Sequence, residues 1–207
     1  ASLRSEDWLY KMFGIDAELL IDHAWGYETC RMSDIKNYHS EEHSLSNGQV
    51  LMRNYSFDEA LVIVREMTDN LVLDLFEKGL VTSSLTLWIA YDHRYEHEAS
   101  KGTVKLERES NSSKKIIDAV EDLYLRIADR YTGIRRIEVC ANRVAPESYV
   151  QYSLFDDPKQ TDKERHLQEA VLNVKQRYGK NAIMRGSNLL ECSTYRERNE
   201  QIGGHRA

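Results

Sequence analysis

Apolar positions in the middle of the chain switch between a strand-like period of two and a helix-like period of about 3.6. Four segments alternate as half-buried strands do: residues 49–55, 85–91, 103–108 and 134–142. Between them, residues 57–78 and 113–130 each place their apolar side chains on one helical stripe. The order βαββαβ predicts an α+β fold of the ferredoxin-like type, with a four-stranded antiparallel sheet and both helices on one face. The other face of such a sheet can remain open.

The two ends of the chain carry weaker periodicity than its middle. Residues 1–27 are typical of two short helices around a glycine, and residues 28–47 have no clear period, so we interpret them as a linker. Residues 48–145 form the predicted domain. Residues 146–207 contain one further predicted helix, which starts with a capping-box pattern at 161–164. One face of this helix is lined by Leu167, Ala170, Val171, Val174 and Tyr178.

Composition places the chain among globular proteins with one good core. It has 207 residues, of which 41% are apolar. No apolar run approaches the roughly 18 residues that a membrane span needs, and no signal peptide opens the sequence. The three cysteines, Cys30, Cys140 and Cys192, are odd in number and far apart. They indicate reduced thiols rather than a disulfide framework, which favours a cytoplasmic protein.

Charge restricts where a nucleic acid could bind. The net charge is −6, so any DNA contact has to come from a local basic face. Basic side chains favour the predicted strands and turns, and eight of them are our candidate DNA-binding residues: Arg53, Arg94, Lys101, Lys105, Arg108, Arg135, Arg136 and Arg143. A sheet face with Lys and Arg can contact successive phosphates. The alternative is a solvated face of mixed charge, because Glu107, Glu109 and Glu138 lie among them.

Patterns that resemble catalytic or metal sites have simpler explanations. Ser56 and Glu59 fit a helix capping box, whereas a two-metal site would need carboxylates that converge from a second strand. Two pairs of histidines fall in the predicted linker and in a polar turn, with no cysteine beside them. Cys140 has no evident histidine to activate it as a nucleophile. We therefore expect no catalytic residue, no metal ligand and no cofactor in this segment.

One short stretch fits neither a helix nor a strand. It consists of Gln151, Tyr152, Ser153, Leu154 and Phe155, and an acidic pair follows it. As an extended peptide it could place Leu154 and Phe155 in an apolar pocket of a partner, while Gln151 makes a directional hydrogen bond. The alternative is a loop whose Leu and Phe cap the hydrophobic edge of the domain.

Several stretches together resemble the C-terminal part of bacterial Y-family translesion DNA polymerases of the UmuC/ImpB/MucB type. Residues 13–26 are similar to the end of that family's helix-hairpin-helix thumb. Residues 46–50 resemble the entry to its little-finger domain, and residues 57–67 resemble the first little-finger helix. Residues 151–155 resemble its sliding-clamp-binding peptide, and residues 197–205 its terminal segment.

This resemblance implies a module that binds damaged or primer–template DNA and docks on the sliding clamp, the beta subunit of the replicative polymerase. The parent enzyme would act in error-prone translesion synthesis, within DNA repair and the SOS response of the bacterial cytoplasm. The metal-binding carboxylates of the palm, which hold magnesium in the family, do not occur in this sequence. By itself the segment is therefore not expected to polymerise DNA.

Two other functions are compatible with the residues alone. The acidic balance and the missing catalytic residues also fit a non-catalytic adaptor that binds a clamp through its peptide and another protein through its sheet. A small-molecule-binding ferredoxin-like domain is the third alternative, but it predicts convergent polar groups that the sequence does not show.

Overall fold

The computed structural model describes residues 5–37, 43–94, 96–148, 157–202 and 205–206. The chain divides into two compact units, Ala1–Glu42 and His43–Ala207. None of the described helices is long and apolar enough to cross a membrane.

The first unit consists of the helices α1 (Glu6–Phe13), α2 (Asp16–Trp25) and α3 (Met32–Asn37). The hydroxyl of Ser5 caps α1 and Gly14 ends it at a φ of 58°. The two expected short helices are confirmed, whereas α3 lies in the stretch that the sequence indicated to be a linker. Among residues 5–37 of this unit, only Leu9 and Ala17 are buried, so these helices share almost no core.

The second unit is built on an antiparallel sheet. Its strands are β1 (Ser44–Tyr55), β2 (Leu80–Tyr91), β3 (Ser100–Ser110) and β4 (Ile134–Asn142), in the order β1-β4-β2-β3. The short strand β5 (Ala145–Pro146) pairs with the start of β2. Each strand–helix–strand unit is thus split by a strand of the other unit. The predicted α+β fold with a βαββαβ core is confirmed.

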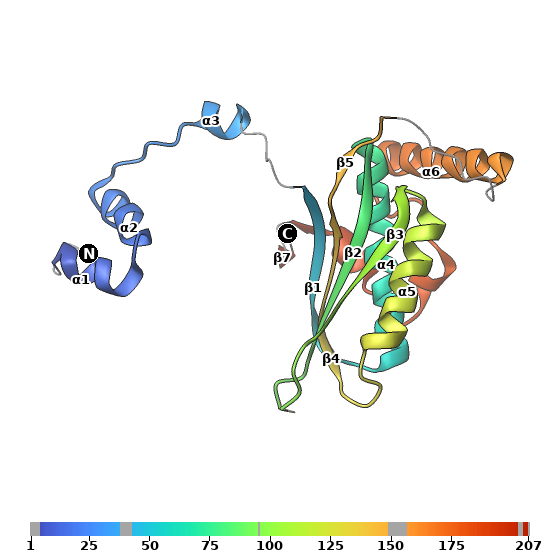
Figure 1. Cartoon of the computed structure of the whole chain (residues 1–207), viewed down its shortest axis with the longest axis horizontal. Helices are drawn as coiled ribbons and strands as arrows, with labels where there is room; N and C mark the ends of the chain where they lie inside the picture. The colour runs from blue at the N-terminus through green and yellow to red at the C-terminus, as the bar shows by residue number, and fades with distance from the viewer. Residues whose placement is uncertain (1–4, 38–42, 95, 149–156, 203–204, 207) are drawn as a thin grey trace. The chain divides into compact units, whose positions relative to one another are not determined.

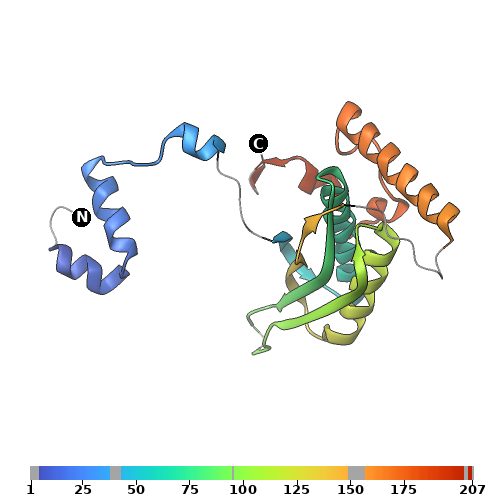
Figure 2. The same cartoon turned by 45° about the horizontal axis from the view of Figure 1, so that its top comes forward.

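Helices α4 (Phe57–Glu77) and α5 (Ser113–Ile127) cover one face of this sheet (Figure 1). The core lies between the two layers, where strand residues such as Leu87, Ile89 and Val139 meet Ile63 and Val120 of the helices. All five are fully buried. In Figure 2 the strands again lie to one side of the helix layer, and no described helix of the second unit covers the other face of the sheet.

Strand β1 begins at Ser44, earlier than the expected position 49, and the compact unit accordingly starts before residue 48. Residues 44–47 contain no β-branched or aromatic side chain, so the local pattern is weak. Pairing with β4 makes them a strand, because Ser44 to Val50 run in continuous register with Asn142 to Arg136. Strands β2 and β3 are longer than expected for the same reason.

Helix α6 (Pro158–Tyr178) starts earlier than the capping-box pattern indicated. Asp157 is its N-cap and accepts a hydrogen bond from the amide of Lys159 at 3.0 Å, and Pro158 fits the first turn. Thr161 lies inside the helix. The apolar face of this helix is only partly covered: Val171 and Val174 are half-buried, whereas Leu167 is 63% exposed and Tyr178 is 67% exposed. Gln168 is the buried residue, and it donates to the carbonyl oxygen of Asn111.

A C-terminal segment, residues 180–200, packs on the helix layer. It contains the 3-10 helix η1 (Gly186–Leu189) and α7 (Tyr195–Asn199), and β6 (Gln201–Ile202) and β7 (His205–Arg206) follow it. Glu66 of α4 is only 2% exposed and anchors this segment. Its carboxylate accepts hydrogen bonds from Asn188 Nδ2 at 3.1 Å, from the Ser193 hydroxyl and from the Thr194 amide.

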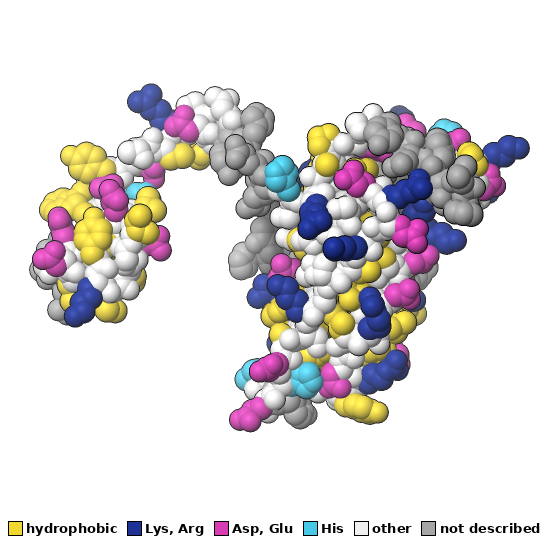
Figure 3. Space-filling model, in the orientation of Figure 1, with side chains coloured by type: hydrophobic (Ala, Val, Ile, Leu, Met, Phe, Trp, Pro, Cys, Tyr) yellow, Lys and Arg dark blue, Asp and Glu magenta, His cyan; other side chains and the backbone are white. Residues whose placement is uncertain are grey.

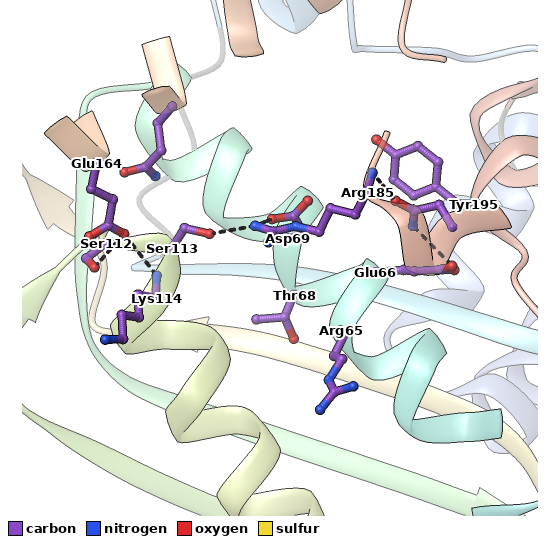
Figure 4. Close-up of polar contacts among 12 residues, drawn as sticks. Arg65, Glu66, Thr68, Asp69, Ser112, Ser113, Lys114, Glu164, Arg185 and Tyr195 are labelled. Atoms are coloured by element: carbon purple, nitrogen blue, oxygen red, sulfur yellow. Dashed lines mark hydrogen bonds and ion pairs between the residues drawn. The ribbon is translucent and has the colours of Figure 1, made fainter. Parts of the chain in front are cut away.

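A second set of contacts ties the same layer together (Figure 4). Arg185 pairs with Asp69 of α4 at 2.6 Å and also donates to the hydroxyl of Ser113. The carboxylate of Glu164 on α6 accepts from the hydroxyl of Ser112 and from the amide of Lys114, at the N-terminus of α5. Two further segments, α6 and residues 180–200, therefore pack on the helix layer, and none of the described helices of this unit lies on the other face of the sheet.

Candidate nucleic-acid interface

The strand register sets out which side chains share the uncovered sheet face. Residues of one phase, among them Leu85, Leu87 and Ile137, are fully buried against α4 and α5. The opposite phase forms four cross-strand rows: Val50–Arg136–Ala90, Gly48–Glu138–Trp88–Lys101, Ser46–Cys140–Thr86–Thr103 and Ser44–Asn142–Ser84–Lys105. We call these rows the open face. They consist mainly of polar and charged side chains around one central tryptophan.

A hollow of about 430 Å³ lies in the middle of the open face. It is lined by Thr86, Trp88, Lys101, Thr103, Arg136, Glu138, Cys140 and Asn142. Hydrogen bonds between strands order its floor: Asn142 Nδ2 donates to Thr86 Oγ1 at 2.8 Å, and the Thr86 and Thr103 hydroxyls are 2.9 Å apart. These contacts fix several side chains before any ligand binds.

Three of the eight predicted basic residues share this face. Lys101 and Arg136 line the hollow, and Lys105 belongs to the row beside it. All three are exposed. Figure 3 shows Lys and Arg side chains dispersed over the strand side of this unit, with Asp and Glu between them. The face is therefore basic at particular positions and not uniformly.

Arg136 is held by two neighbours on the open face. Its guanidinium lies 5.1 Å from the centroid of the Trp88 ring, within the range of a cation–π contact. It also forms an ion pair with Glu138 at 3.6 Å, which is long and exposed and therefore contributes little to stability. A phosphate can thus replace Glu138 as the partner of Arg136 while the guanidinium stays on the indole.

Arg53 has a different environment. It donates to both carboxylate oxygens of Glu59, at 3.1 Å and 2.7 Å, and its guanidinium lies over the Tyr55 ring. Glu59 also completes the predicted capping box with Ser56, which is confirmed. The hydrogen bond from Arg53, followed by the one from the Ser56 amide, lowers the pKa of Glu59 from 4.5 to about 2. Arg53 therefore stabilises the start of α4.

Arg94 is engaged in a similar way at the end of β2. Its side chain donates twice to Oδ2 of Asp92, at 2.9 Å and 2.5 Å, and Asn54 donates to the same oxygen. The hydrogen bonds from Arg94 hold the pKa of the buried Asp92 well below its usual range. Arg94 thus compensates a buried carboxylate beside the β2–β3 turn.

The other three predicted residues occupy irregular positions of the sheet. Arg135 lies between Ile134 and Arg136, where the pairing of β4 shifts register. Arg108 is exposed in the part of β3 where register with β2 is lost, between Lys105 and Ser110. Arg143 follows β4 directly, is exposed and has a φ of 49°. The structure does not bring these three into the rows around the hollow.

Charge alone did not predict the uncharged residues that line the hollow. Trp88, Thr86, Thr103 and Asn142 belong to it, and the signal for them was the period of two. Trp88 is out of phase with the buried Leu87 and Ile89, so alternation alone places it on the open face. Cys140 lies there too, and burial, followed by the charge of Glu138, raises the pKa of its thiol. The predicted clamp peptide, residues 151–155, lies outside the described residues.

Comparison with known proteins points to one family. The model of the impB/mucB/samB family C-terminal domain matches residues 42–154. The chain is 25% identical over 203 residues to DNA polymerase IV 2 of Bacillus subtilis (strain 168), covering 96% of this chain and 47% of that protein. It is 21% identical over 168 residues to DNA polymerase IV 2 of Halalkalibacterium halodurans, covering 81% and 40%. The chain thus spans less than half the length of these relatives.

Solved structures of the same kind are more distant. One is the little finger domain of PolIV in complex with the beta-clamp processivity factor, with 12% identity and a TM-score of 0.39. The match covers 55% of the present chain and 100% of the little finger chain in that complex. Another is a Y-family DNA polymerase chimera of Dbh and Dpo4, with 16% identity and a TM-score of 0.39 over 69% of this chain and 39% of that chain.

Proposed function

The chain belongs to the impB/mucB/samB family, of which residues 42–154 form the C-terminal domain, and from this premise we propose that it is the DNA-binding and clamp-docking module of a translesion DNA polymerase. The relatives that it matches are named as DNA polymerases. The module would hold primer–template DNA and connect the enzyme to a sliding clamp during damage tolerance. Its open face would contact DNA, and residues 151–155 would contact the clamp.

One observation carries the DNA-binding half of this proposal. Lys101, Lys105 and Arg136 are exposed in three of the four rows of the open face, which no described helix of this unit covers. Lys101 and Lys105 are four residues apart on β3, about 13 Å, and Arg136 lies on β4, two strands or about 10 Å across the sheet, so the three cations can contact separate phosphates. Such contacts neutralise phosphate charge and release counterions without reading sequence.

The chemistry of polymerisation is not assigned to these residues. In the described parts of the chain, no three His, Cys, Asp or Glu side chains converge in a way that could hold a metal ion. A two-metal mechanism needs such converging carboxylates. We therefore propose that magnesium-dependent catalysis belongs to those regions of the relatives that this chain does not span.

The DNA-binding proposal is tested by titrating labelled primer–template duplex with the chain at several salt concentrations. We expect binding that weakens steeply with salt, and lower affinity in Lys101→Ala and in Arg136→Ala. Each variant should reduce the slope of log K against log salt by about 1, the value for one lost phosphate contact. Arg126→Ala is the matched control, because Arg126 is exposed on α5, on the covered side of the sheet. Equal affinities for all four proteins would contradict the proposal.

A second candidate function is that of a clamp-binding adaptor that does not bind DNA. It is favoured because two of the predicted arginines already pair with carboxylates of this chain. Arg53 and Arg94 each bind a carboxylate within this chain, which leaves fewer cations for DNA on a protein of net charge −6. A non-catalytic clamp-binding adaptor would need none of them. That function predicts no duplex binding even at low salt, together with intact binding to a sliding clamp.

A further inference from the structure

We propose that the hollow of the open face binds the base of an unpaired nucleotide, stacked on the surface formed by Trp88 and Arg136. The proposal rests on the proposed function, and it adds that this face binds single-stranded nucleic acid through a base as well as through phosphates.

The stacking surface consists of two planar groups. Trp88 lies on the central strand β2 and lines the hollow, and the guanidinium of Arg136 lies 5.1 Å from its ring centroid. Unpaired bases stack on aromatic rings and on arginine guanidinium planes. Here the guanidinium lies over the indole, so a base can stack on the outer side of the guanidinium, with Trp88 supporting it from below. Because Arg136 is exposed and only weakly paired with Glu138, a ligand can reach the guanidinium while it stays on the indole.

The charges along one cross-strand row determine how a nucleotide would lie on the open face. Across the sheet, Trp88 is flanked by Glu138 on β4 and by Lys101 on β3. A phosphate is attracted to Lys101 and repelled by Glu138, so the backbone would follow the β3 side. The base would then extend over Trp88 toward Glu138, whose carboxylate can accept hydrogen bonds from exocyclic amino groups. Beyond Glu138 the row ends at Gly48, which presents no side chain to obstruct it.

The floor of the hollow can form hydrogen bonds with base edges that differ in their arrangement of donors and acceptors. The side chains of Thr86, Thr103 and Asn142 are ordered by hydrogen bonds with one another. Hydroxyl and amide groups both donate and accept, so they can adapt to different bases. The volume of about 430 Å³ also falls within the range of small-ligand sites.

Paired DNA cannot use this surface in the same way. In a duplex, each base face is covered by the next base pair, so only phosphates and groove edges reach a protein. A stacking site is of use only to a base that has left the helix or that lies in a single-stranded stretch. The hollow would therefore favour single-stranded template over duplex.

The test uses two single-stranded oligonucleotides of about 12 residues. One carries bases throughout, and the other is matched in phosphate number but abasic at its central positions. Each is titrated with the wild-type chain, with Trp88→Phe and with Trp88→Ala at a single low salt concentration. Thermal melts establish that the variants fold.

We expect the wild-type chain to bind the strand with bases on the order of 5- to 150-fold more tightly than the abasic strand, as one stacked base contributes. Trp88→Phe should keep most of this ratio, whereas Trp88→Ala should bring it close to one by weakening only the strand with bases. If Trp88→Ala weakened both strands equally, or left the ratio unchanged, the inference would be overturned while the proposed duplex binding could still stand. If the chain bound neither these strands nor duplex at low salt, both proposals would fail.

Discussion

Replacing Glu66 with alanine is expected to detach the C-terminal segment from the helix layer and to destabilise the second unit. Glu66 is buried, and its carboxylate accepts from the side chains of Asn188 and Ser193 and from the Thr194 amide. Alanine leaves these donors without their acceptor in a buried site. Each orphaned donor costs about 1–3 kcal/mol, so we expect a loss of about 3 kcal/mol or more in the free energy of unfolding.

Limited proteolysis and chemical denaturation measure the two parts of this prediction. Cleavage in residues 180–200 should become much faster in Glu66→Ala, and Glu66→Gln should show an intermediate effect because its amide oxygen still accepts. Arg65→Ala is the matched control. Arg65 is the next residue in the chain, and its guanidinium pairs with Glu121 at 2.5 Å on the surface. Such a surface pair contributes about 1 kcal/mol or less. Equal losses in Glu66→Ala and Arg65→Ala would show that Glu66 does not anchor the segment.

Replacing Leu154 and Phe155 together with alanine is expected to abolish binding to a sliding clamp. In short peptide motifs a few apolar anchors contribute most of the binding free energy, and each costs about 2 kcal/mol or more when truncated. Two anchors lost together would weaken binding by about 4 kcal/mol, roughly a thousandfold. The unfolding midpoint should stay at the wild-type value, because the proposal places both side chains in the partner.

Surface plasmon resonance on an immobilised bacterial sliding clamp, together with a thermal melt, checks both statements. Leu167→Ala with Tyr178→Ala is the control, since it removes two exposed apolar side chains from α6 instead. The control should bind as the wild type does. Marked unfolding of the Leu154→Ala, Phe155→Ala variant would mean that the stretch caps the domain, as the loop alternative holds.

Two features that depend on neighbours in the chain were predicted correctly from the sequence. The βαββαβ order followed from the two hydrophobic periods, and the capping box of Ser56 and Glu59 is present as predicted. Both are local patterns, in which the residues that interact are close in sequence. For the same reason the start of β4 at Ile134 and its end at Asn142 were predicted correctly.

Features that depend on distant residues were not predicted. Glu66 resembled any acidic residue of a solvated helix, yet it is buried by residues more than a hundred positions away. Arg53 and Arg94 are exceptions, because their partners Glu59 and Asp92 are only six and two positions away. These pairs depend on how the chain turns at the ends of β1 and β2, which the hydrophobic periods do not predict. The hollow on the open face likewise depends on strand register, which aligns Trp88, Glu138 and Lys101 from three separate strands.

NMR mapping of the chain with primer–template DNA tests the central claim most directly, namely that the open face is the nucleic-acid surface. On titration, the amide signals that shift should belong to the rows around the hollow, with Thr86, Trp88, Lys101 and Arg136 among the largest changes. The indole N–H signal of Trp88 should shift with them. Signals from the outer surfaces of α4 and α5 should stay in place. Shifts confined to the helix layer, or none at all at low salt, would contradict the account.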